Sequence, residues 1–278
     1  MTIGNSIIKS INKPATRGLL KSIIYWRYKQ RGKKIDLVNF HKEFDAWEFR
    51  IDGVTYLGSG PGWVYDRDYL HEQLRQLSGF AYMPKYGDTV IDIGAGVGEE
   101  TIIFSSLVGS TGKVFAVEAH PKTYKALEYL VKSNYLGNVI SSNMALSDKA
   151  GTVNIEDSDN SLANSILHVS NRNTFTIQAE TFDDFVERNN IQSIDFLKMN
   201  VEGAEQLIVK GMVKTLKRIK HLAISCHDFR FRQGESEFFK TKQIVVDFLT
   251  CNNFKISTQH SSVSMVDDYV YGTNPDLV

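Results

Sequence analysis

A short apolar run that ends in a cluster of glycines constrains this chain more than any other feature of its sequence. Residues 89–93 (Thr-Val-Ile-Asp-Ile) have the pattern of a buried strand, three glycines follow within residues 94–98, and Glu99 then opens a helix-like stretch. Glycines are needed there because the backbone must turn tightly and let a ligand approach without a Cβ in the way. A strand, a glycine turn and a helix in that order predict one unit of a doubly wound α/β fold.

From Asp88 to the C-terminus, short apolar segments alternate with stretches of helical periodicity, which is typical of a parallel sheet covered by helices. The clearest helix begins at Pro121, because proline suits a first helical position, and it carries Tyr124, Leu127 and Leu130 at helical spacing. We therefore predict an α/β fold with a doubly wound, mostly parallel sheet, whose strands lie at residues 89–93, 113–117, 138–142, 195–199, 221–226, 254–257 and 269–271. Two further short strands are expected at residues 152–155 and 175–178, with a surface loop at 157–173 between them.

The region before the sheet divides in two by charge and pattern. Residues 1–34 carry nine Lys or Arg and no acidic residue, which leaves a net charge of −9 on the rest of a chain that is neutral as a whole. Apolar residues at helical spacing on both sides of Pro14 predict a basic, amphipathic arm of two short helices. Residues 35–84 contain a predicted hairpin, 47–51 and 54–57 around the turn Asp52-Gly53, and a helix at 68–77. We interpret residues 35–84 as a cap on the substrate side of an α/β domain at residues 85–278.

Composition and missing motifs narrow the location and the chemistry. No apolar run reaches the length of a membrane span, no signal-peptide run opens the chain, and Cys226 and Cys251 belong to no CxxC pair. We therefore expect a cytoplasmic protein. In the arm, Tyr25, Trp26 and Tyr28 among the cations favour peripheral contact with the inner face of an anionic membrane. A helix that packs internally or mediates dimerisation is the alternative.

Acidic residues around the glycines indicate which ligand the loop receives. Loops that bind dinucleotides usually have the spacing GxGxxG and place a pyrophosphate at the helix N-terminus. Here the spacing is GxGxG, and Asp92, Glu99 and Glu100 would repel a phosphate. S-adenosylmethionine instead carries an ammonium and a sulfonium, and Glu118 at the end of the next strand is placed to hold its ribose. The alternatives are a helix-capping role for Asp92 and an ordinary turn beside a solvated Glu118.

Four segments of the chain match the motifs of one known family: residues 92–98 (DIGAGVG), 117–121 (VEAHP), 143–147 (NMALS) and, most specifically, 198–205 (KMNVEGAE). Over about residues 84–227 the chain resembles the FkbM family of S-adenosylmethionine-dependent methyltransferases. The resemblance implies the seven-stranded, Rossmann-like class I methyltransferase fold and methylation of a hydroxyl on a sugar or a related natural product. The chain departs from the family at two positions, where the family usually has Asn for Gly96 and Asp for Asn200.

The resemblance also implies where the cofactor contacts the chain. The glycine loop would face the methionine moiety, Glu118 the ribose, and two segments around residues 119–120 and 143–145 the adenine. For His120, the alternative is a partly exposed position near a helix start. The expected cofactor-binding residues are Asp92, Gly94, Ala95, Gly96, Gly98, Glu99, Thr101, Glu118, Ala119, His120, Asn143, Met144 and Ala145.

Polar residues at the ends of two neighbouring strands are the candidates for catalysis, because groups at the carboxyl ends of parallel strands converge. The strand at 195–199 supplies Lys198, Asn200 and Glu202, and the strand at 221–226 leads into His227 and Asp228. Methyl transfer to oxygen is an in-line displacement that needs the acceptor's proton removed, and His227 is the expected general base. No metal is favoured, although Mg²⁺ held by Glu202, His227 and Asp228 is an alternative. A purely structural interpretation pairs Glu202 with Lys198 and lets His227 cap the following turn.

Aromatic and polar side chains in residues 63–72 are suited to bind sugars, with Tyr65, His71 and Asp228 as expected substrate contacts. An amphipathic lid helix that packs on the core is the alternative interpretation of this segment. We expect an O-methyltransferase for a sugar-containing acceptor such as a surface glycan, a glycolipid or a glycosylated natural product. The alternatives are an RNA methyltransferase whose arm binds phosphates and a non-catalytic S-adenosylmethionine-binding module, which Asn200 would favour. An oligomer is compatible with each of these.

Overall fold

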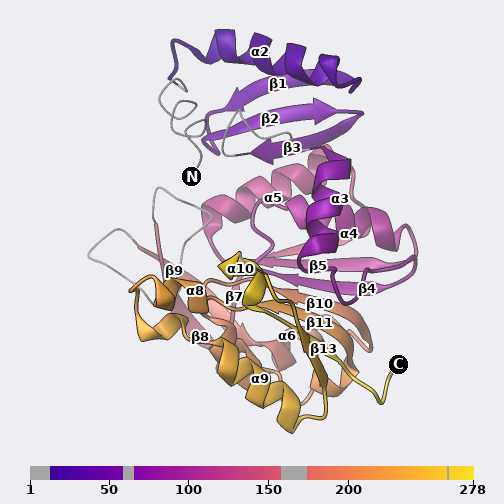
Figure 1. Ribbon diagram of the computed structural model, residues 1–278, viewed down its shortest axis with the longest axis vertical. Helices are drawn as coiled ribbons and strands as arrows, with labels where there is room; N and C mark the ends of the chain where they lie inside the picture. The colour runs from indigo at the N-terminus through magenta and orange to yellow at the C-terminus, as the bar shows by residue number, and fades with distance from the viewer. Residues whose placement is uncertain (1–12, 59–65, 158–173, 262) are drawn as a thin grey trace.

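A seven-stranded sheet forms the centre of the computed structural model, which describes residues 13–58, 66–157, 174–261 and 263–278 (Figure 1). The strand order is β12-β13-β11-β10-β4-β5-β6, and neighbouring strands are parallel except where β13 takes part. The predicted doubly wound, mostly parallel sheet is therefore confirmed, with every boundary within two residues of its expected position. The strands are β4 (Thr89–Ile93), β5 (Lys113–Glu118), β6 (Val139–Asn143), β10 (Ile194–Met199), β11 (Ile219–Ser225), β12 (Lys255–Thr258) and β13 (Tyr269–Thr273).

Helices cover both faces of the sheet because its central strands are apolar on both sides. In β4, Val90 belongs to one hydrophobic cluster and Ile91 to another, as expected for consecutive residues of a strand. The first cluster includes residues of α4 (Glu99–Val108) and α5 (Pro121–Ser133), and the second includes residues of α6 (Phe182–Arg188) and α9 (Lys242–Cys251). Shorter elements complete the domain: α7 (Glu205–Ile208), α8 (Asp228–Arg232), α10 (Ser264–Asp267) and 3₁₀ turns at Val209–Gly211, Leu216–Arg218 and Glu237–Phe239.

A small second sheet follows β6 directly. Its strands are β7 (Ala145–Ser147), β8 (Gly151–Glu156) and β9 (Thr174–Thr181), in the order β7-β9-β8. The two short strands expected at residues 152–155 and 175–178 are thus present, but they pair with each other and with β7 rather than with the main sheet. The loop predicted between them lies, except for its first residue, outside the described residues.

The N-terminal region forms one unit rather than an arm followed by a hairpin. It consists of α2 (Arg17–Gln30) and a three-stranded antiparallel sheet of β1 (Ile35–His41), β2 (Ala46–Ile51) and β3 (Val54–Gly58). The predicted hairpin is β2–β3, whereas β1 was missed because most of its residues are only partly buried and give no clear alternation. The side chains of Leu20, Ile24 and Tyr28 on α2 are buried in the core of this unit. The helix predicted before Pro14 lies outside the described residues.

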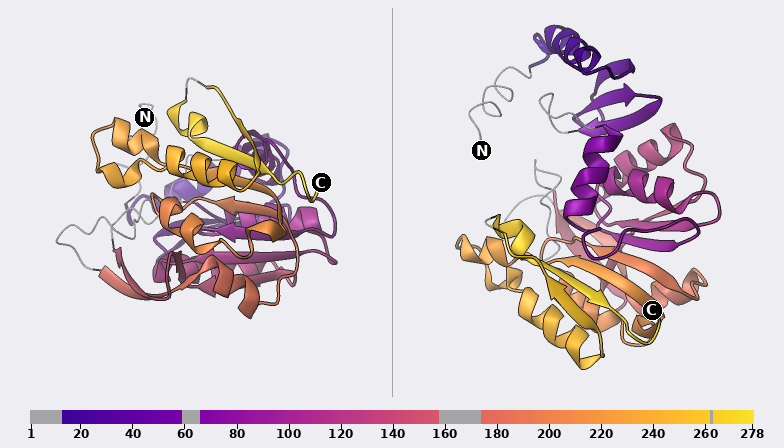
Figure 2. Two further views of the ribbon diagram at one scale, coloured as in Figure 1. Left: turned by 90° about the horizontal axis from the view of Figure 1, so that it is seen from below. Right: turned by 45° about the vertical axis from the view of Figure 1, so that its right-hand side comes forward.

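This N-terminal unit packs on α5, at one end of the molecule (Figures 1 and 2). The Asn134 side chain accepts the Thr55 backbone N–H at 2.7 Å and donates to the Thr55 carbonyl at 2.8 Å, so it continues the hydrogen bonding of β3 onto the end of α5. The Tyr129 hydroxyl donates to Glu48 at 2.6 Å. The helix expected at residues 68–77 is α3 (Arg67–Gln76), which begins at the N-cap Asp66 and packs against α4.

Among the described residues, no helix combines the length and the apolar character that crossing a membrane requires.

Candidate active site

The glycine loop joins β4 to α4 and lies between the ends of two other strands. The backbone N–H groups of Gly94 and Ala95 donate to the Val117 carbonyl at the end of β5, at 2.9 and 3.1 Å. Gly94 has a φ of +72°, and a Cβ at this residue would lie 1.9 Å from the Asn200 carbonyl oxygen. Only glycine therefore fits between β5 and the segment after β10. At Gly96, with a φ of +59°, a Cβ would meet no atom within 4 Å.

A cavity of about 200 Å³ lies beside this loop, at the carboxyl ends of β4, β5 and β10. This is the edge of an open α/β sheet at which ligands bind. Acidic residues outnumber basic ones in its described lining, which contains four glutamates and one lysine. The lining residues are Ile93, Gly94, Ala95, Gly96, Val97, Glu99, Glu100, Val117, Glu118, Ala119, His120, Thr123, Met144, Ala145, Leu146, Ile155, Lys198, Asn200, Val201, Glu202 and Ile208.

Glu118 ends β5 with its carboxylate fixed by two backbone groups. One oxygen accepts the N–H of Gly96 and the other accepts the N–H of His120, both at 2.9 Å. Burial raises the pKa of Glu118, and these two hydrogen bonds oppose the rise. Each carboxylate oxygen keeps one lone pair free, which suits a ligand with two adjacent hydroxyl groups.

His120 is buried at the start of α5, and one of its ring nitrogens makes no hydrogen bond within the described residues. Nδ1 accepts the backbone N–H of Thr123 at 3.4 Å, so the proton of the neutral ring lies on Nε2. Burial lowers the pKa of His120 and keeps the ring neutral. Nε2 has no hydrogen-bond partner among the described residues, and the nearest acidic oxygen, on Asp157, is 3.7 Å away. His120 is thus a helix N-cap that also carries a free donor, rather than the partly exposed residue of the alternative interpretation.

Lys198 and Asp92 form a buried ion pair on adjacent strands. The Lys198 ammonium lies 2.9 Å from one Asp92 oxygen, donates to the Gly94 carbonyl at 2.8 Å and lies 3.3 Å from Glu100. The other Asp92 oxygen accepts the Thr101 hydroxyl at 2.7 Å. Burial disfavours the charge of Lys198, but the carboxylates of Asp92 and Glu100 outweigh it and raise the lysine pKa.

This ion pair changes three expectations. Asp92 and Thr101 do not line the cavity; Thr101 donates to Asp92, which also binds Lys198 beneath the glycine loop. Asp92 does not cap a helix either, because within the part of the chain that the structure describes it accepts from two side chains and from no backbone N–H. Lys198 pairs with Asp92 and Glu100, and the structural interpretation that paired it with Glu202 is wrong.

Glu99, in the first turn of α4, lines the cavity with a carboxyl group that has no compensating cation. Burial, together with the charge of neighbouring Glu100, raises the pKa of Glu99 to about 7. No ion pair to Glu99 is found within the described residues, whereas Glu100 lies 3.3 Å from Lys198 and accepts the Ser78 hydroxyl. A carboxyl group in this state favours a cationic ligand.

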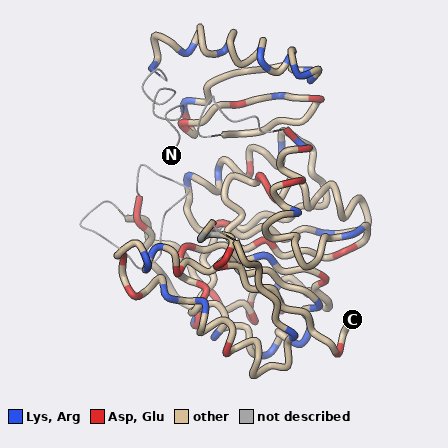
Figure 3. Tube along the Cα trace, viewed as in Figure 1, with Lys and Arg blue, Asp and Glu red and all other residues tan. Residues whose placement is uncertain are grey.

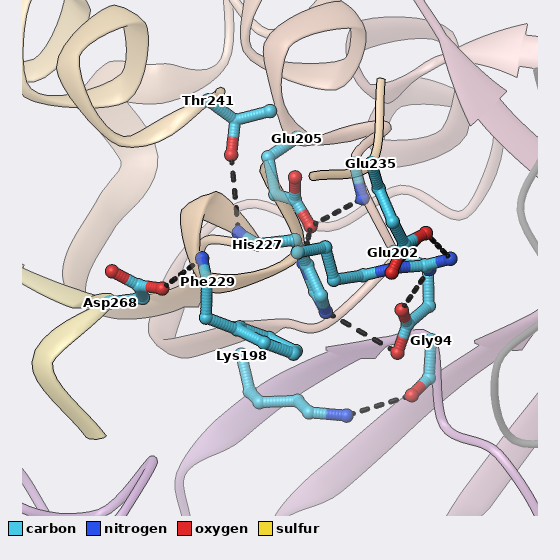
Figure 4. Close-up of polar contacts among 11 residues, drawn as sticks. Gly94, Lys198, Glu202, Glu205, His227, Phe229, Glu235, Thr241 and Asp268 are labelled. Atoms are coloured by element: carbon cyan, nitrogen blue, oxygen red, sulfur yellow. Dashed lines mark hydrogen bonds and ion pairs between the residues drawn. The ribbon is translucent and has the colours of Figure 1, made fainter. Parts of the chain in front are cut away.

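Glu202, His227 and Glu205 are linked one to the next by ion pairs (Figure 4). Glu202 lines the cavity and has a φ of +51°, and one of its carboxylate oxygens lies 3.3 Å from His227 Nε2. His227 Nδ1 donates to Glu205 at 2.7 Å, and the same Glu205 oxygen accepts the backbone N–H of Gly203 at 3.2 Å. The second Glu202 oxygen accepts from Arg230 at 2.7 Å.

The two carboxylates determine the charge state of His227. Burial alone would lower its pKa, but the charge of Glu205 and hydrogen bonds to Glu202 and Glu205 raise it to about 10. Burial would raise the pKa of Glu202, but its hydrogen bond to His227 and the charges of His227 and Arg230 hold it below the usual range. At neutral pH His227 is therefore an imidazolium and Glu202 a carboxylate.

This arrangement does not fit His227 as a general base, because a base needs a free lone pair and both ring nitrogens carry protons held by carboxylates. Asp228 does not join the group either. Its carboxylate accepts the backbone N–H groups of Thr241 and Lys242 at the start of α9, at 2.9 and 2.8 Å, so it caps that helix. Asp228 therefore caps α9 through one carboxylate oxygen, and it is not among the residues that line the cavity. Within the described residues, no three His, Cys, Asp or Glu side chains are grouped to hold a metal ion.

The remaining expected site residues are divided between the cavity and its surroundings. Ala119, Met144, Ala145 and Asn200 line the cavity. The Asn143 side chain instead donates to the carbonyls of Glu118 and Ala119, and thereby ties β6 to β5. His71 lies on α3 and does not line the cavity, and Tyr65 lies outside the described residues. No described residue of the predicted cap, residues 35–84, lines the cavity.

Sequence reasoning missed three partners in this site. Glu205 belongs to the motif at residues 198–205, but nothing in the sequence indicated that it would bind His227. No sequence feature pointed to Arg230 as a partner of Glu202. The Lys198–Asp92 pair was predictable, because aligning the carboxyl ends of the two strands places these residues opposite each other in the β10–β4 register.

Comparison with known proteins identifies similar chains. The family model described as the methyltransferase FkbM domain matches residues 92–256, more than half of the chain. The hexuronic acid methyltransferase AglP of Haloferax volcanii is 26% identical over 185 residues, which cover 66% of this chain and 70% of that protein. The crystal structure of methyltransferase FkbM from Methylobacillus flagellatus gives a TM-score of 0.49 at 18% identity and covers 74% of this chain. The match spans 50% of that crystallised chain.

Proposed function

Because this chain belongs to the FkbM methyltransferase family, we propose that it transfers a methyl group from S-adenosylmethionine to a hydroxyl of a sugar-containing acceptor. Family membership supports methyl transfer. The similarity to a hexuronic acid methyltransferase supports a sugar as the acceptor. The cavity at the carboxyl ends of the strands supports a ligand site of the kind that such a cofactor needs.

The proposed cofactor is chosen mainly because the buried carboxyl group of Glu99 has no ion-pair partner within the described residues. S-adenosylmethionine is cationic at its ammonium and sulfonium groups, and a cation beside Glu99 would restore the charge that burial disfavours. The free lone pairs of Glu118 match the two hydroxyls of a ribose, and the unpartnered Nε2–H of His120 matches an acceptor such as a purine nitrogen. These residues fit an adenosine carrying a positive charge better than a phosphate-bearing nucleotide.

We propose that Glu202 accepts the proton that the acceptor hydroxyl loses during methyl transfer. When bound, S-adenosylmethionine supplies an electrophilic methyl group. Glu202 lines the same cavity, and its depressed pKa keeps it ionised at neutral pH. Each of its oxygens retains a lone pair beside the contacts with His227 and Arg230, so one can accept a hydrogen bond from the acceptor hydroxyl. The hydroxyl is thereby oriented, and its proton passes to Glu202.

Two other residues act through their neighbours in this proposal. His227 positions Glu202, because its imidazolium is anchored on Glu205 and holds the Glu202 carboxylate in one place and in one charge state. Lys198 positions the glycine loop, because its ammonium binds the Gly94 carbonyl and the Asp92 carboxylate at once. Asn200 lines the cavity beside Glu202 and is the remaining candidate for a hydrogen bond to the acceptor.

A radiolabelled methyl-transfer screen tests the proposal. Purified protein and tritiated S-adenosylmethionine are offered neutral glycosides, hexuronic acid glycosides and RNA in parallel. We expect label in a glycoside, and the label should resist mild alkali because an ether, unlike a methyl ester, is not hydrolysed. Label in RNA alone, or label released by alkali, would refute the assignment of a sugar hydroxyl.

Thermal stabilisation by S-adenosylhomocysteine tests cofactor binding independently of the acceptor. It therefore shows which of the two assignments is wrong if the screen detects no methyl transfer. A ligand that binds the folded protein alone raises the unfolding temperature. We expect a rise for the wild type and a smaller one for Glu118→Gln. No rise in the wild type would refute the cofactor assignment, whatever the acceptor screen shows.

A further inference from the structure

The outer face of α2 is apolar although the inner face of the same helix already packs on the N-terminal sheet. Leu19, Ile23 and Trp26 recur at positions i, i+4 and i+7 and so lie on one side of the helix. Their exposed fractions are 67%, 50% and 61%. We call these three residues the α2 outer face. Exposed large side chains that occur singly need no explanation, but three in one stripe indicate a contact surface.

Cations flank this stripe. On a helical projection Arg27 lies on one side of it and Lys29 on the other, and Arg31 follows at the C-terminal end of the helix. Within the described residues, no hydrogen bond or ion pair involves the side chains of these three cations, whereas the side chains of Lys21 and Lys33 bind Asn39 and Asp68. The helix itself carries no acidic residue, as the charge distribution in Figure 3 shows.

We propose that the α2 outer face docks on an anionic lipid surface. A helix that presents an aromatic and aliphatic stripe between cations lies flat in the interface of an anionic bilayer, with the stripe in the acyl boundary and the cations at the headgroups. Tyr25, which is also exposed, adds a side chain that prefers this region. Figure 1 shows α2 as the outermost layer at its end of the molecule, so a flat surface can approach it.

Two other occupants fit this face less well. In a symmetric contact between two copies of the chain, the cations of one α2 would approach those of the other and repel them. A nucleic acid would pair with Arg27 and Lys29 but would leave Leu19 and Ile23 without apolar partners. Of these three occupants, a lipid surface matches both the apolar stripe and its flanking cations.

Vesicle sedimentation tests the proposal with the full chain. We expect binding to vesicles of phosphatidylcholine with phosphatidylserine, weaker binding at high salt, and little binding to phosphatidylcholine alone. Trp26 reports the contact directly, because its emission should shift to shorter wavelength on binding, and Trp26→Phe should abolish the shift. Absence of binding to the anionic vesicles would overturn the proposal.

Substitutions separate the stripe from its cations. The double variant Ile23→Ser, Trp26→Ser should weaken binding roughly tenfold or more, and replacing Arg27, Lys29 and Arg31 with Gln should cost about fivefold per charge on anionic vesicles only. Val213→Ser is the matched control, since Val213 is 64% exposed at a distant position, and its binding should equal that of the wild type.

Wild-type binding by the double variant would overturn the proposal, as would a dimer that the same variant disrupts without any lipid binding. Stabilisation by S-adenosylhomocysteine should be unchanged in all of these variants.

Discussion

Two glutamates in one cavity have pKa values shifted in opposite directions, and the difference assigns them different roles. Burial and the charge of Glu100 raise the pKa of Glu99 to about 7, so this group changes its charge where a cationic ligand would bind. Burial would do the same to Glu202, but its hydrogen bond to His227 and the charges of His227 and Arg230 prevail and keep it ionised. The environment of each carboxyl group, rather than its residue type, decides what it does.

The raised pKa of Glu99 predicts that cofactor affinity depends on pH. A cationic ligand favours the ionised carboxylate, so affinity should increase as the pH rises through 7 and level off above it. We expect the dissociation constant of S-adenosylmethionine to fall about tenfold between roughly pH 6 and pH 8, as measured by calorimetry. Glu99→Gln is the control and should bind with little pH dependence over this range. An unchanged pH dependence in Glu99→Gln would contradict the assignment of the cation site.

The raised pKa of His227 predicts a pH dependence of stability. Because its pKa in the folded protein is about 10, above the unfolded value of about 6.5, its stabilising contribution is complete below pH 6.5 and is lost as the pH rises through 10. Urea unfolding should show stability declining across this window by up to about 1.4 kcal/mol per pH unit. The variant Glu205→Gln, His227→Gln, which leaves no charge of this pair behind, should lack that part of the decline. Identical pH profiles for this variant and the wild type would show that His227 is not charged in the fold.

Among the helices and strands, those that follow from the spacing of apolar residues along the sequence could be predicted. The central strands β4, β10 and β11 and the helix from Pro121 were predictable, because buried strands are continuous apolar runs and helices have a 3.6-residue period. Strand β1 was not, because the adjacent apolar residues Leu37 and Val38 change the phase of its alternation, and its pairing with β2 has a register shift between Ile35 and Leu37. The side-chain contacts of the site were predictable only where strand register fixes them, as for Lys198 and Asp92. The contact between His227 and Glu205 could not be predicted, because it depends on the geometry of turns after two different strands, which no local sequence pattern indicates.

The loop between β4 and α4 provides a matched pair of substitutions. Gly94→Ala places a Cβ 1.9 Å from the Asn200 carbonyl oxygen at a φ of +72°, so the loop must move or the strands must separate. We expect a loss of stability of several kcal/mol, about 1–3 kcal/mol of it from backbone strain alone, and loss of binding to S-adenosylhomocysteine. Gly96→Asn should fold with nearly wild-type stability, because a Cβ there meets no atom and Asn tolerates a positive φ. Equal unfolding temperatures for the two variants would contradict this account of the loop.

At the scale of the whole molecule, the zero net charge conceals two different surfaces. The cavity of the sheet domain is lined by four glutamates and one lysine, whereas α2 carries cations and no acidic residue. The N-terminal unit that bears α2 is joined to the sheet domain through α5, where Asn134 completes both hydrogen bonds of Thr55. The orientation of the α2 outer face relative to the cavity therefore depends on this junction.

The junction can be weakened at one residue. Asn134→Ala leaves the backbone N–H and carbonyl of Thr55 without their partners in a part-buried contact, which should cost about 1–3 kcal/mol. Amide exchange should increase in β3 while the amides of β4 and β10 stay protected. Asn252→Ala is the control, because the Asn252 side chain donates only to a carbonyl of its own helix, and it should leave exchange in β3 unchanged. Equal exchange in both variants would show that the N-terminal unit is held by other contacts.

If Glu202 receives the acceptor's proton during methyl transfer, the variant Glu202→Gln should differ from the wild type in the chemical step and not in cofactor binding. The measurement is the rate of methyl transfer from S-adenosylmethionine to the glycoside found in the screen, alongside the affinity for S-adenosylhomocysteine. Loss of a general base costs roughly 10²–10⁴-fold in rate, so we predict a kcat lower by that factor with cofactor affinity nearly unchanged. A Glu202→Gln variant that transfers methyl groups at the wild-type rate would contradict the claim.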